Sequence, residues 1–188
     1  MDITLFPSQG NIFLKKINSK TGLTEDKLDG YLIDSDEKEI RRIIDILKAK
    51  KQKKIIAIQG RDDAFNRRII ETCKVDYLVS PESEPKKDSL KQRDSGINHV
   101  VAKEAKKKNI PIVINFSELN KLDKKSKSKK ISRIIQNLKI CRKNQCKIKI
   151  ASFAETKEQI ADEYSLKSFL FSLGASSQQV GEATQFSN

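Results

Sequence analysis

Short apolar runs alternate with longer amphipathic segments from about residue 30 to the end of the chain, and this order limits the possible folds more than any other feature. The clearest run, residues 55–58, is apolar at four consecutive positions, as expected of a strand covered on both faces. Strands that alternate with helices form parallel sheets with helical crossovers. We therefore expect an α/β fold, either a barrel or an open doubly wound sheet.

Six segments are predicted as strands, and a weaker extended piece is predicted at 12–14. The six strands lie at 3–6, 31–33, 55–58, 75–79, 110–116 and 148–152. A chain of 188 residues is long enough to bury one core, so residues 1–188 are expected to form a single domain. That domain would include a basic loop and helix over 121–143 and a short C-terminal helix over 176–186.

Positive charge is concentrated in one quarter of the chain. The formal net charge is +13, and residues 101–150 alone hold sixteen Lys and Arg against three Asp and Glu. Such concentration favours a nucleic acid as partner over a merely solvated surface. A nonspecific basic protein of chromatin or ribosomes is a third possibility. An aromatic content of 6% argues against base stacking as the main mode of recognition.

Location is predicted from the cysteines and from the absence of targeting signals. Cys73, Cys141 and Cys146 are an odd number without metal-ligand spacing, which is typical of reduced, partly buried thiols. No apolar run approaches the roughly 18 residues that a membrane span needs, and no signal peptide opens the chain. We expect a cytoplasmic protein without a membrane partner.

Catalytic chemistry finds little support in the residues. The single histidine, His99, has no associated nucleophile motif, and we expect it to hydrogen-bond rather than to catalyse. Four carboxylates follow predicted strands: Asp34, Asp36, Asp62 and Asp63. They leave open an alternative function, a stand-alone phosphoesterase barrel in which these carboxylates hold Mg²⁺. Helix capping is the simpler explanation for them. No G-x-G-x-x-G or P-loop motif is present.

The lysines at 121–130 are expected in a connection ahead of a helix that contains Ile131 to Cys141. They form either a solvated loop or a loop that contacts phosphates, with Lys124 and Lys125 among the contacts. The basic residues near the end of that helix, Arg142 and Lys143, are partly explained by the helix dipole.

Residues 93–103 have the sequence RDSGINHVVAK, which predicts a turn that opens a helix over about 96–108. We expect this turn to present free backbone amides together with Arg93, an arrangement that favours a phosphate. The same string, after VDYLVSP at 75–81, resembles the ribonuclease P protein component 3 family. The family pattern is a strand ending in Ser-Pro, a variable loop, a basic residue, Asp, a small residue, Gly, an aliphatic residue, Asp or Asn, His, and a helix.

The resemblance covers roughly residues 55–175, with a second match at 150–154 and 171–174. It departs from the family at 164–168, where YSLKS replaces a basic residue followed by Pro. The resemblance implies a TIM-barrel-like parallel β/α barrel, complete or incomplete, related in fold to metal-dependent phosphoesterase barrels.

The function that the resemblance implies is that of a non-catalytic, RNA-binding subunit of ribonuclease P, which removes the 5′ leader from precursor tRNA. Catalysis would lie in the RNA with Mg²⁺, and the chain itself would bind no cofactor. Its implied partners are the ribonuclease P RNA, component 2 in a heterotetramer, the other protein subunits and, indirectly, precursor tRNA. Family positions linked to RNA binding map onto Arg68, Arg93, His99, Lys108, Arg142 and Lys143.

Overall fold

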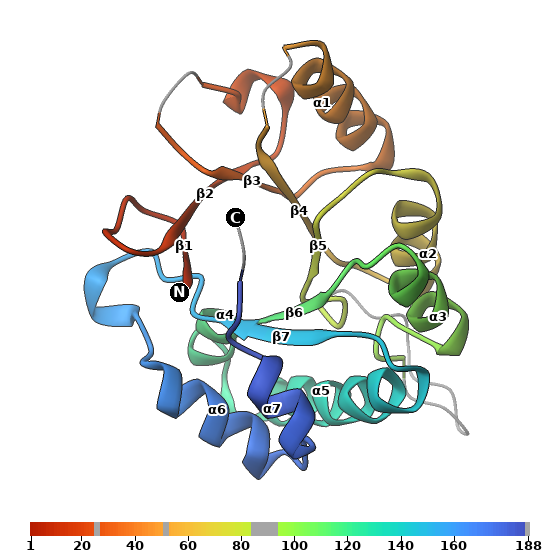
Figure 1. Cartoon of the computed structure of the whole chain (residues 1–188), viewed down its shortest axis with the longest axis vertical. Coiled ribbons are helices and arrows are strands. Elements are labelled where there is room, and N and C mark those ends of the chain that lie inside the picture. Colours follow the sequence, from red (N-terminus) through yellow and green to blue (C-terminus); the bar gives the residue numbers. More distant parts are fainter. Residues whose placement is uncertain (25–26, 51–52, 84–93, 187–188) are drawn as a thin grey trace.

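The computed structural model describes residues 1–24, 27–50, 53–83 and 94–186. Within these residues, seven parallel strands follow one another around a sheet in chain order (Figure 1). The strands are β1 (Ile3–Thr4), β2 (Ile12–Ile17), β3 (Gly30–Ile33), β4 (Ile55–Gln59), β5 (Tyr77–Val79), β6 (Ile112–Asn115) and β7 (Ile148–Ala151). All six predicted strands are confirmed, and the weaker piece at 12–14 is part of β2, a six-residue strand.

The sheet closes on itself between β1 and the residues after β7. The backbone N–H of Leu5 donates to the carbonyl oxygen of Ala154 over 2.7 Å, and the N–H of Phe153 donates to Ile3 over 2.8 Å. A bridge between Thr4 and Ala154 is also parallel. The fold is therefore a nearly closed, TIM-barrel-like β/α barrel, and the open-sheet alternative is wrong.

Helices surround the barrel on the outside of the strands (Figure 1). They are α1 (Glu37–Ala49), α2 (Asp63–Thr72), α3 (His99–Lys107), α4 (Phe116–Asn120), α5 (Lys124–Asn144), α6 (Glu163–Ser172) and α7 (Ser177–Glu182), with short 3₁₀ turns at Lys20–Gly22 and Lys157–Gln159. Asp36 and Asp62 cap α1 and α2 by accepting from the backbone N–H groups of Glu39 and Phe65. Within the described residues, no helix is long and apolar enough to cross a membrane.

Two apolar clusters fill the structure, one between sheet and helices and one inside the barrel. The inner cluster uses alternate strand positions, among them Leu14, Leu32 and Val113, because successive side chains of a strand point to opposite faces. Phe186, in the segment that crosses the barrel after α7 in Figure 1, packs edge-on against Tyr77, with ring centroids 5.8 Å apart. Tyr77 opens β5, so Phe186 closes the barrel at the amino ends of the strands.

Three element boundaries differ from expectation. The C-terminal helix expected over 176–186 is α7, which ends at Glu182. The helix expected from about Gly96 begins at His99, because Gly96 has φ +76° and Asn98 caps the helix by accepting from the N–H groups of Val100 and Val101. The connection expected at 117–128 instead contains α4 and the first turn of α5. Asp123 caps α5 by accepting from the N–H groups of Lys125 and Ser126, so most of the 121–130 lysines are helical.

Candidate functional site

The carboxyl ends of the strands carry a polar layer on the inner face of the barrel. Strand alternation places Gln59 in line with Ala57, Asn115 in line with Val113, and Lys16 in line with Leu14, all of which face inward. Functional sites of β/α barrels lie at this end of the strands. We therefore expect a functional site in this polar layer.

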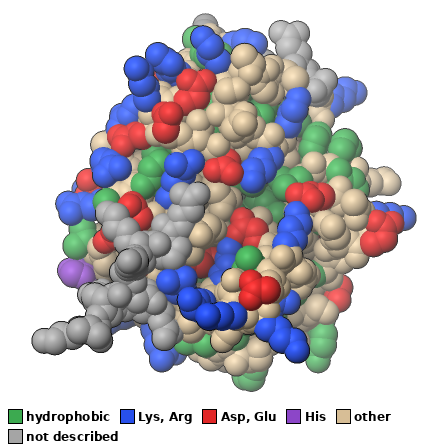
Figure 2. All heavy atoms as spheres, turned by 180° about the vertical axis from the view of Figure 1, so that it is seen from behind, with side chains coloured by type: hydrophobic (Ala, Val, Ile, Leu, Met, Phe, Trp, Pro, Cys, Tyr) green, Lys and Arg blue, Asp and Glu red, His purple; other side chains and the backbone are tan. Residues whose placement is uncertain are grey.

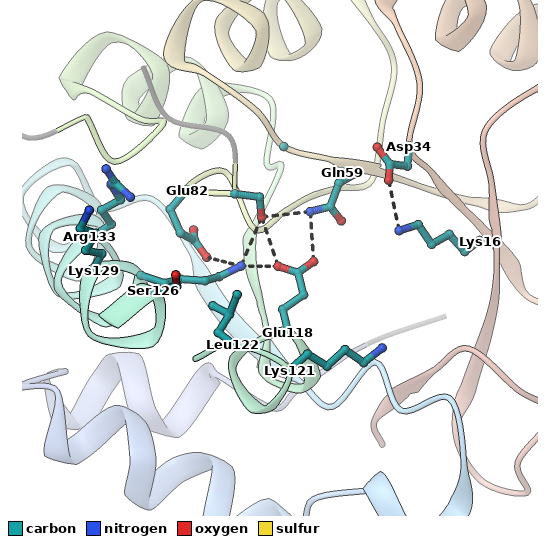
Figure 3. A pocket seen from close by; sticks show the side chains of 13 residues that line it. Lys16, Asp34, Gln59, Glu82, Glu118, Lys121, Leu122, Ser126, Lys129 and Arg133 are labelled. Carbon is teal, nitrogen blue, oxygen red and sulfur yellow. Dashed lines mark hydrogen bonds and ion pairs between the residues drawn. The ribbon is translucent and has the colours of Figure 1, made fainter. Parts of the chain in front are cut away.

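A cavity of about 530 Å³ opens at this end. Five cationic side chains and three carboxyl groups line it: Lys16, Lys121, Lys129, Lys130, Arg133, Asp34, Glu82 and Glu118. Figure 2 shows the face on which His99, the only histidine, lies, with acidic and basic side chains in a central hollow. Figure 3 shows that lining side chains reach the cavity from two sides, with Glu82 and Glu118 on one side and Lys16 and Asp34 on the other.

Lys130 of α5 is the centre of a buried polar network. Its side chain is 8% exposed, and its ammonium group contacts a carboxylate oxygen of Glu118 and lies 3.7 Å from Oε1 of Glu82. The hydroxyl of Ser83 lies 3.2 Å from the same ammonium group and donates to Glu118 over 3.1 Å. The network thus ties α5 to the ends of β5 and β6.

Gln59 completes this network from β4. Its side-chain amide donates to Oε1 of Glu118 over 3.1 Å and to the Ser83 hydroxyl over 3.2 Å. Asn115 also donates to Glu118, over 3.2 Å. The Glu118 carboxylate therefore has three side-chain donors besides Lys130, which keeps it in one position.

Glu82 is the least exposed carboxyl group of the site. Its side chain has no solvent exposure, and burial raises its pKa to about 7, although the nearby Lys130 ammonium lowers it in part. Its Oε1 atom accepts no hydrogen bond, and its Oε2 accepts a long one, 3.5 Å, from Asn137. The charged form of Glu82 is thus poorly compensated in the folded protein.

We expect Glu82→Gln to reduce the pH dependence of the free energy of unfolding between about pH 4.5 and 7. The unfolded carboxyl titrates near 4.5 and the folded one near 7, so the folded state holds the extra proton between these values. The free energy of unfolding then falls between pH 4.5 and 7, by up to about 3 kcal/mol. Denaturant unfolding at pH 5 and pH 8 should show this fall in the wild type and a smaller fall in the variant. Equal falls in both proteins would contradict the buried, proton-binding state of Glu82.

The turn at residues 94–96 is held by side chains from the protein interior. The Asn66 side chain donates to the carbonyl oxygens of Gly96, over 2.8 Å, and of Arg61, over 2.7 Å. The N–H of Gly96 donates to the carboxylate of Asp94, and Asn137 donates to the carbonyl of Ser95. The expectation of free amides is wrong at Gly96, whose N–H is engaged, and at Val100 and Val101, whose N–H groups donate to Asn98. Phosphate contact at this turn remains a prediction.

The start of α5 places lysines at the surface beside the cavity. Lys124, Lys125 and Lys129 are exposed, whereas Lys130 is buried. The first turn of α5 contains no acidic residue, so lysines lie at the positive end of the helix dipole. Positive charges at this end of the dipole destabilise the helix. Helix stability therefore does not explain why lysines occupy these positions.

The predicted RNA-binding residues lie at both ends of the barrel. His99, Lys124 and Lys125 begin helices, so they lie at the carboxyl ends of the strands. Lys108 follows the last turn of α3, so it lies at the opposite end, as do Arg142 and Lys143 at the end of α5. The structure does not gather the predicted set into one site.

Several of these side chains already have partners. Arg68 donates to the Glu37 carboxylate over 2.8 Å, and the Arg142 side chain donates to Gln179 over 3.1 Å. The Lys108 ammonium group donates to the carbonyl oxygen of Ile70 over 2.8 Å and to that of Glu71, at the end of α2. Lys108 thus caps the α2 carboxyl terminus. Arg93 lies outside the described residues.

His99 is exposed at the first position of α3. Its side chain makes no hydrogen bond to another described residue, and the adjoining turn is held by Asn66 and Asn137 instead. RNA contact by His99 remains a prediction.

The four carboxylates considered for metal binding have other roles. Asp36 and Asp62 are helix caps, and Asp34 pairs with Lys16 over 3.1 Å and with Arg61 over 3.6 Å. Asp63 accepts a long hydrogen bond, 3.5 Å, from Asn98. Among the residues that the structure covers, no group of three or more His, Cys, Asp or Glu could hold a metal ion.

Sequence reasoning missed the centre of the site, which is formed by Gln59, Glu82, Ser83, Glu118 and Lys130. A usable signal was present in the strands, because Gln59 and Asn115 are the polar last residues of otherwise apolar runs. Nothing in the sequence marks Lys130 as buried among so many exposed lysines.

The family model and the curated relatives that match this chain all belong to ribonuclease P protein subunits. Residues 31–186 match the family model described as RNase P subunit p30. Ribonuclease P protein component 3 of Methanocaldococcus jannaschii is 34% identical over 119 residues, which cover 63% of this chain and 48% of that protein. The counterpart in Methanococcus vannielii is 25% identical over 142 residues, 76% of this chain and 58% of that protein. The chain thus spans about half the length of the curated relatives it matches.

Solved structures show the same relationship. A chain in a cryo-EM structure of archaeal ribonuclease P with mature tRNA superposes with a TM-score of 0.72 at 25% identity. The match covers 96% of this chain and 86% of that chain. An amidohydrolase crystal structure matches with a TM-score of 0.60 at 13% identity, over 85% of this chain and 41% of the other, which shows a shared fold alone.

Proposed function

Because this chain belongs to the RNase P subunit p30 family, we propose that it is a non-catalytic protein subunit of ribonuclease P. In this role it binds the RNA of the complex and supports removal of the 5′ leader from precursor tRNA. The similarity to a chain of archaeal ribonuclease P, which covers 96% of this chain, supports the proposal.

The observation that carries RNA binding is the lysine-rich start of α5. Lys124 and Lys125 are exposed at the positive end of the helix, where their charges oppose the dipole. A polyanion laid across this end would remove that repulsion and would release its own counterions. Backbone phosphates of an RNA are such a polyanion, and recognition of the backbone needs few aromatic residues.

Catalysis in this proposal belongs to the RNA with its Mg²⁺ ions. The chain contributes positive charge and shape, and it is expected to bind no cofactor of its own. Ribonuclease P RNA, component 2 in a heterotetramer and the remaining protein subunits are the proposed partners, with precursor tRNA contacted indirectly. A cytoplasmic location remains a prediction from the unpaired cysteines, all three of which are buried.

Replacing Lys124 and Lys125 together with Ala should weaken binding to ribonuclease P RNA and reduce its dependence on salt. Each lost phosphate contact lowers the slope of log K against log salt by roughly one, so we expect a decrease of roughly two. Filter binding or fluorescence anisotropy over a range of KCl concentrations measures both quantities.

The matched control changes Lys48 and Lys50, which are exposed at the carboxyl end of α1, away from the α5 lysines. This control should leave the slope unchanged. Equal slopes for the wild type and the α5 variant would remove Lys124 and Lys125 from the interface, and the proposal would lose its main structural support.

A further inference from the structure

Two buried acceptor atoms in the carboxyl-end cavity lack hydrogen bonds. They are Oε1 of Gln59 and Oε1 of Glu82, on residues that are 7% and 2% exposed. The second atom lies 3.7 Å from the Lys130 ammonium group, an ion pair that is longer than a hydrogen bond. Figure 3 shows the Gln59 oxygen pointing away from the dashed network, to the side of the cavity where Lys16 and Asp34 lie. A buried acceptor without a donor costs free energy, and such atoms in a cavity indicate that a ligand supplies the donors.

The rim of the same cavity carries cationic donors, whereas its interior carries acceptors. Lys129 is exposed on α5 beside the cavity, and Lys121 and Lys16 reach the rim from α4 and β2. Lys121 pairs with Glu155 over 2.8 Å and Lys16 with Asp34 over 3.1 Å, so both cations have partners that an anionic ligand would join or replace. The rim therefore favours an anion, whereas the interior needs donors.

A ligand that fits both parts has an anionic end and a group of hydroxyl or amine donors. A bare phosphate satisfies the rim alone, and a cation satisfies only the interior acceptors. A ribonucleotide has both features, because its phosphate is anionic and its ribose hydroxyls donate to buried carboxyl and amide oxygens, as in dinucleotide sites. The cavity volume of about 530 Å³ lies within the range of small-ligand sites.

We propose that the carboxyl-end cavity binds one unstacked nucleotide of an RNA strand, with its ribose hydroxyls at Gln59 and Glu82 and its phosphate at the lysine rim. This inference rests on the proposed function for the source of the nucleotide. It adds a specific contact to the general attraction of the α5 lysines, since the 2′-hydroxyl distinguishes RNA from DNA.

The test is an NMR titration of the ¹⁵N-labelled chain with adenosine 5′-monophosphate, 2′-deoxyadenosine 5′-monophosphate and inorganic phosphate. The ribonucleotide should shift the amide signals of Gly60, Ser83 and Lys130 and bind on the order of fivefold more tightly than the deoxynucleotide, the effect of one hydrogen bond. Inorganic phosphate should shift rim residues only. Equal affinities for the two nucleotides, or shifts only outside the cavity, would overturn the proposal.

Three variants, two in the interior of the cavity and one at its rim, separate the two parts of the site. Gln59→Met and Glu82→Met remove the two acceptors, so each should reduce the preference for the ribonucleotide, and either one suffices if the other does not fold. Lys129→Ala should weaken both nucleotides by the same factor and leave the preference unchanged. If the wild-type chain restores cleavage by ribonuclease P but shows no preference for the ribonucleotide, the nucleotide site alone is rejected. If the wild-type chain does not restore cleavage, the proposed function is rejected.

Discussion

Gly96→Ala should destabilise the protein by at least about 3 kcal/mol, or prevent folding. An added Cβ would lie 1.8 Å from the carbonyl oxygen of Pro81 and 2.9 Å from that of Arg61, both of which are backbone atoms. Gly96 also has φ +76°, a conformation that side chains disfavour. The turn is fixed by Asn66, which donates to both the Gly96 and the Pro81 carbonyl groups, so it cannot move aside cheaply. Thermal and urea unfolding measure the loss.

The matched control is Gly174→Ala. Gly174 has φ +82°, but nothing lies within 4 Å of its added Cβ. This variant carries the conformational cost without the collision, and we expect a loss of about 1–2 kcal/mol. Similar losses in the two variants would show that the turn at 94–96 is not packed against Pro81 as described.

Lys130→Met should cost about 3–5 kcal/mol at pH 8, because it leaves two carboxyl groups of the cavity without their buried counter-ion. Lys130 contacts Glu118 and lies 3.7 Å from Glu82. The cost should fall at pH 5, where Glu82 takes up a proton, since burial already raises its pKa to about 7. Denaturant unfolding at the two pH values gives the difference.

Lys129→Met is the control for this change, because Lys129 is the adjacent residue but is exposed. Its effect should stay within about 0.5 kcal/mol. Adding Glu118→Gln to Lys130→Met should recover part of the lost stability by removing one uncompensated charge. A loss below about 1 kcal/mol for Lys130→Met at pH 8 would contradict the buried network.

The fold could be predicted where local pattern and tertiary structure agree. The run at 55–58 is apolar throughout because β4 is covered by the barrel interior on one side and by helices on the other. Barrel closure was not evident, since it depends on backbone contacts between Leu5 and Ala154, which are far apart in sequence. The early start of α5 was missed because its first turn is held by the Asp123 cap and not by apolar residues.

The site was harder to predict because it depends on which polar residues are buried. Glu82 follows Ser-Pro, where the family pattern has a variable loop, yet its side chain is fully buried. The sequence does not distinguish Lys108 from other surface lysines. In the structure it follows α3 and caps the carboxyl terminus of the neighbouring helix α2. The more general prediction, that this basic protein binds a polyanion, depends only on the charge distribution and remains a proposal.

The measurement that tests the central claim most directly is cleavage of precursor tRNA by ribonuclease P RNA and the remaining protein subunits, with and without this chain. We predict that cleavage at moderate Mg²⁺ concentration is restored when the chain is added. The component 3 protein of Methanocaldococcus jannaschii serves as the positive control. Restoration by that protein but not by this chain would contradict the account of it as a ribonuclease P subunit.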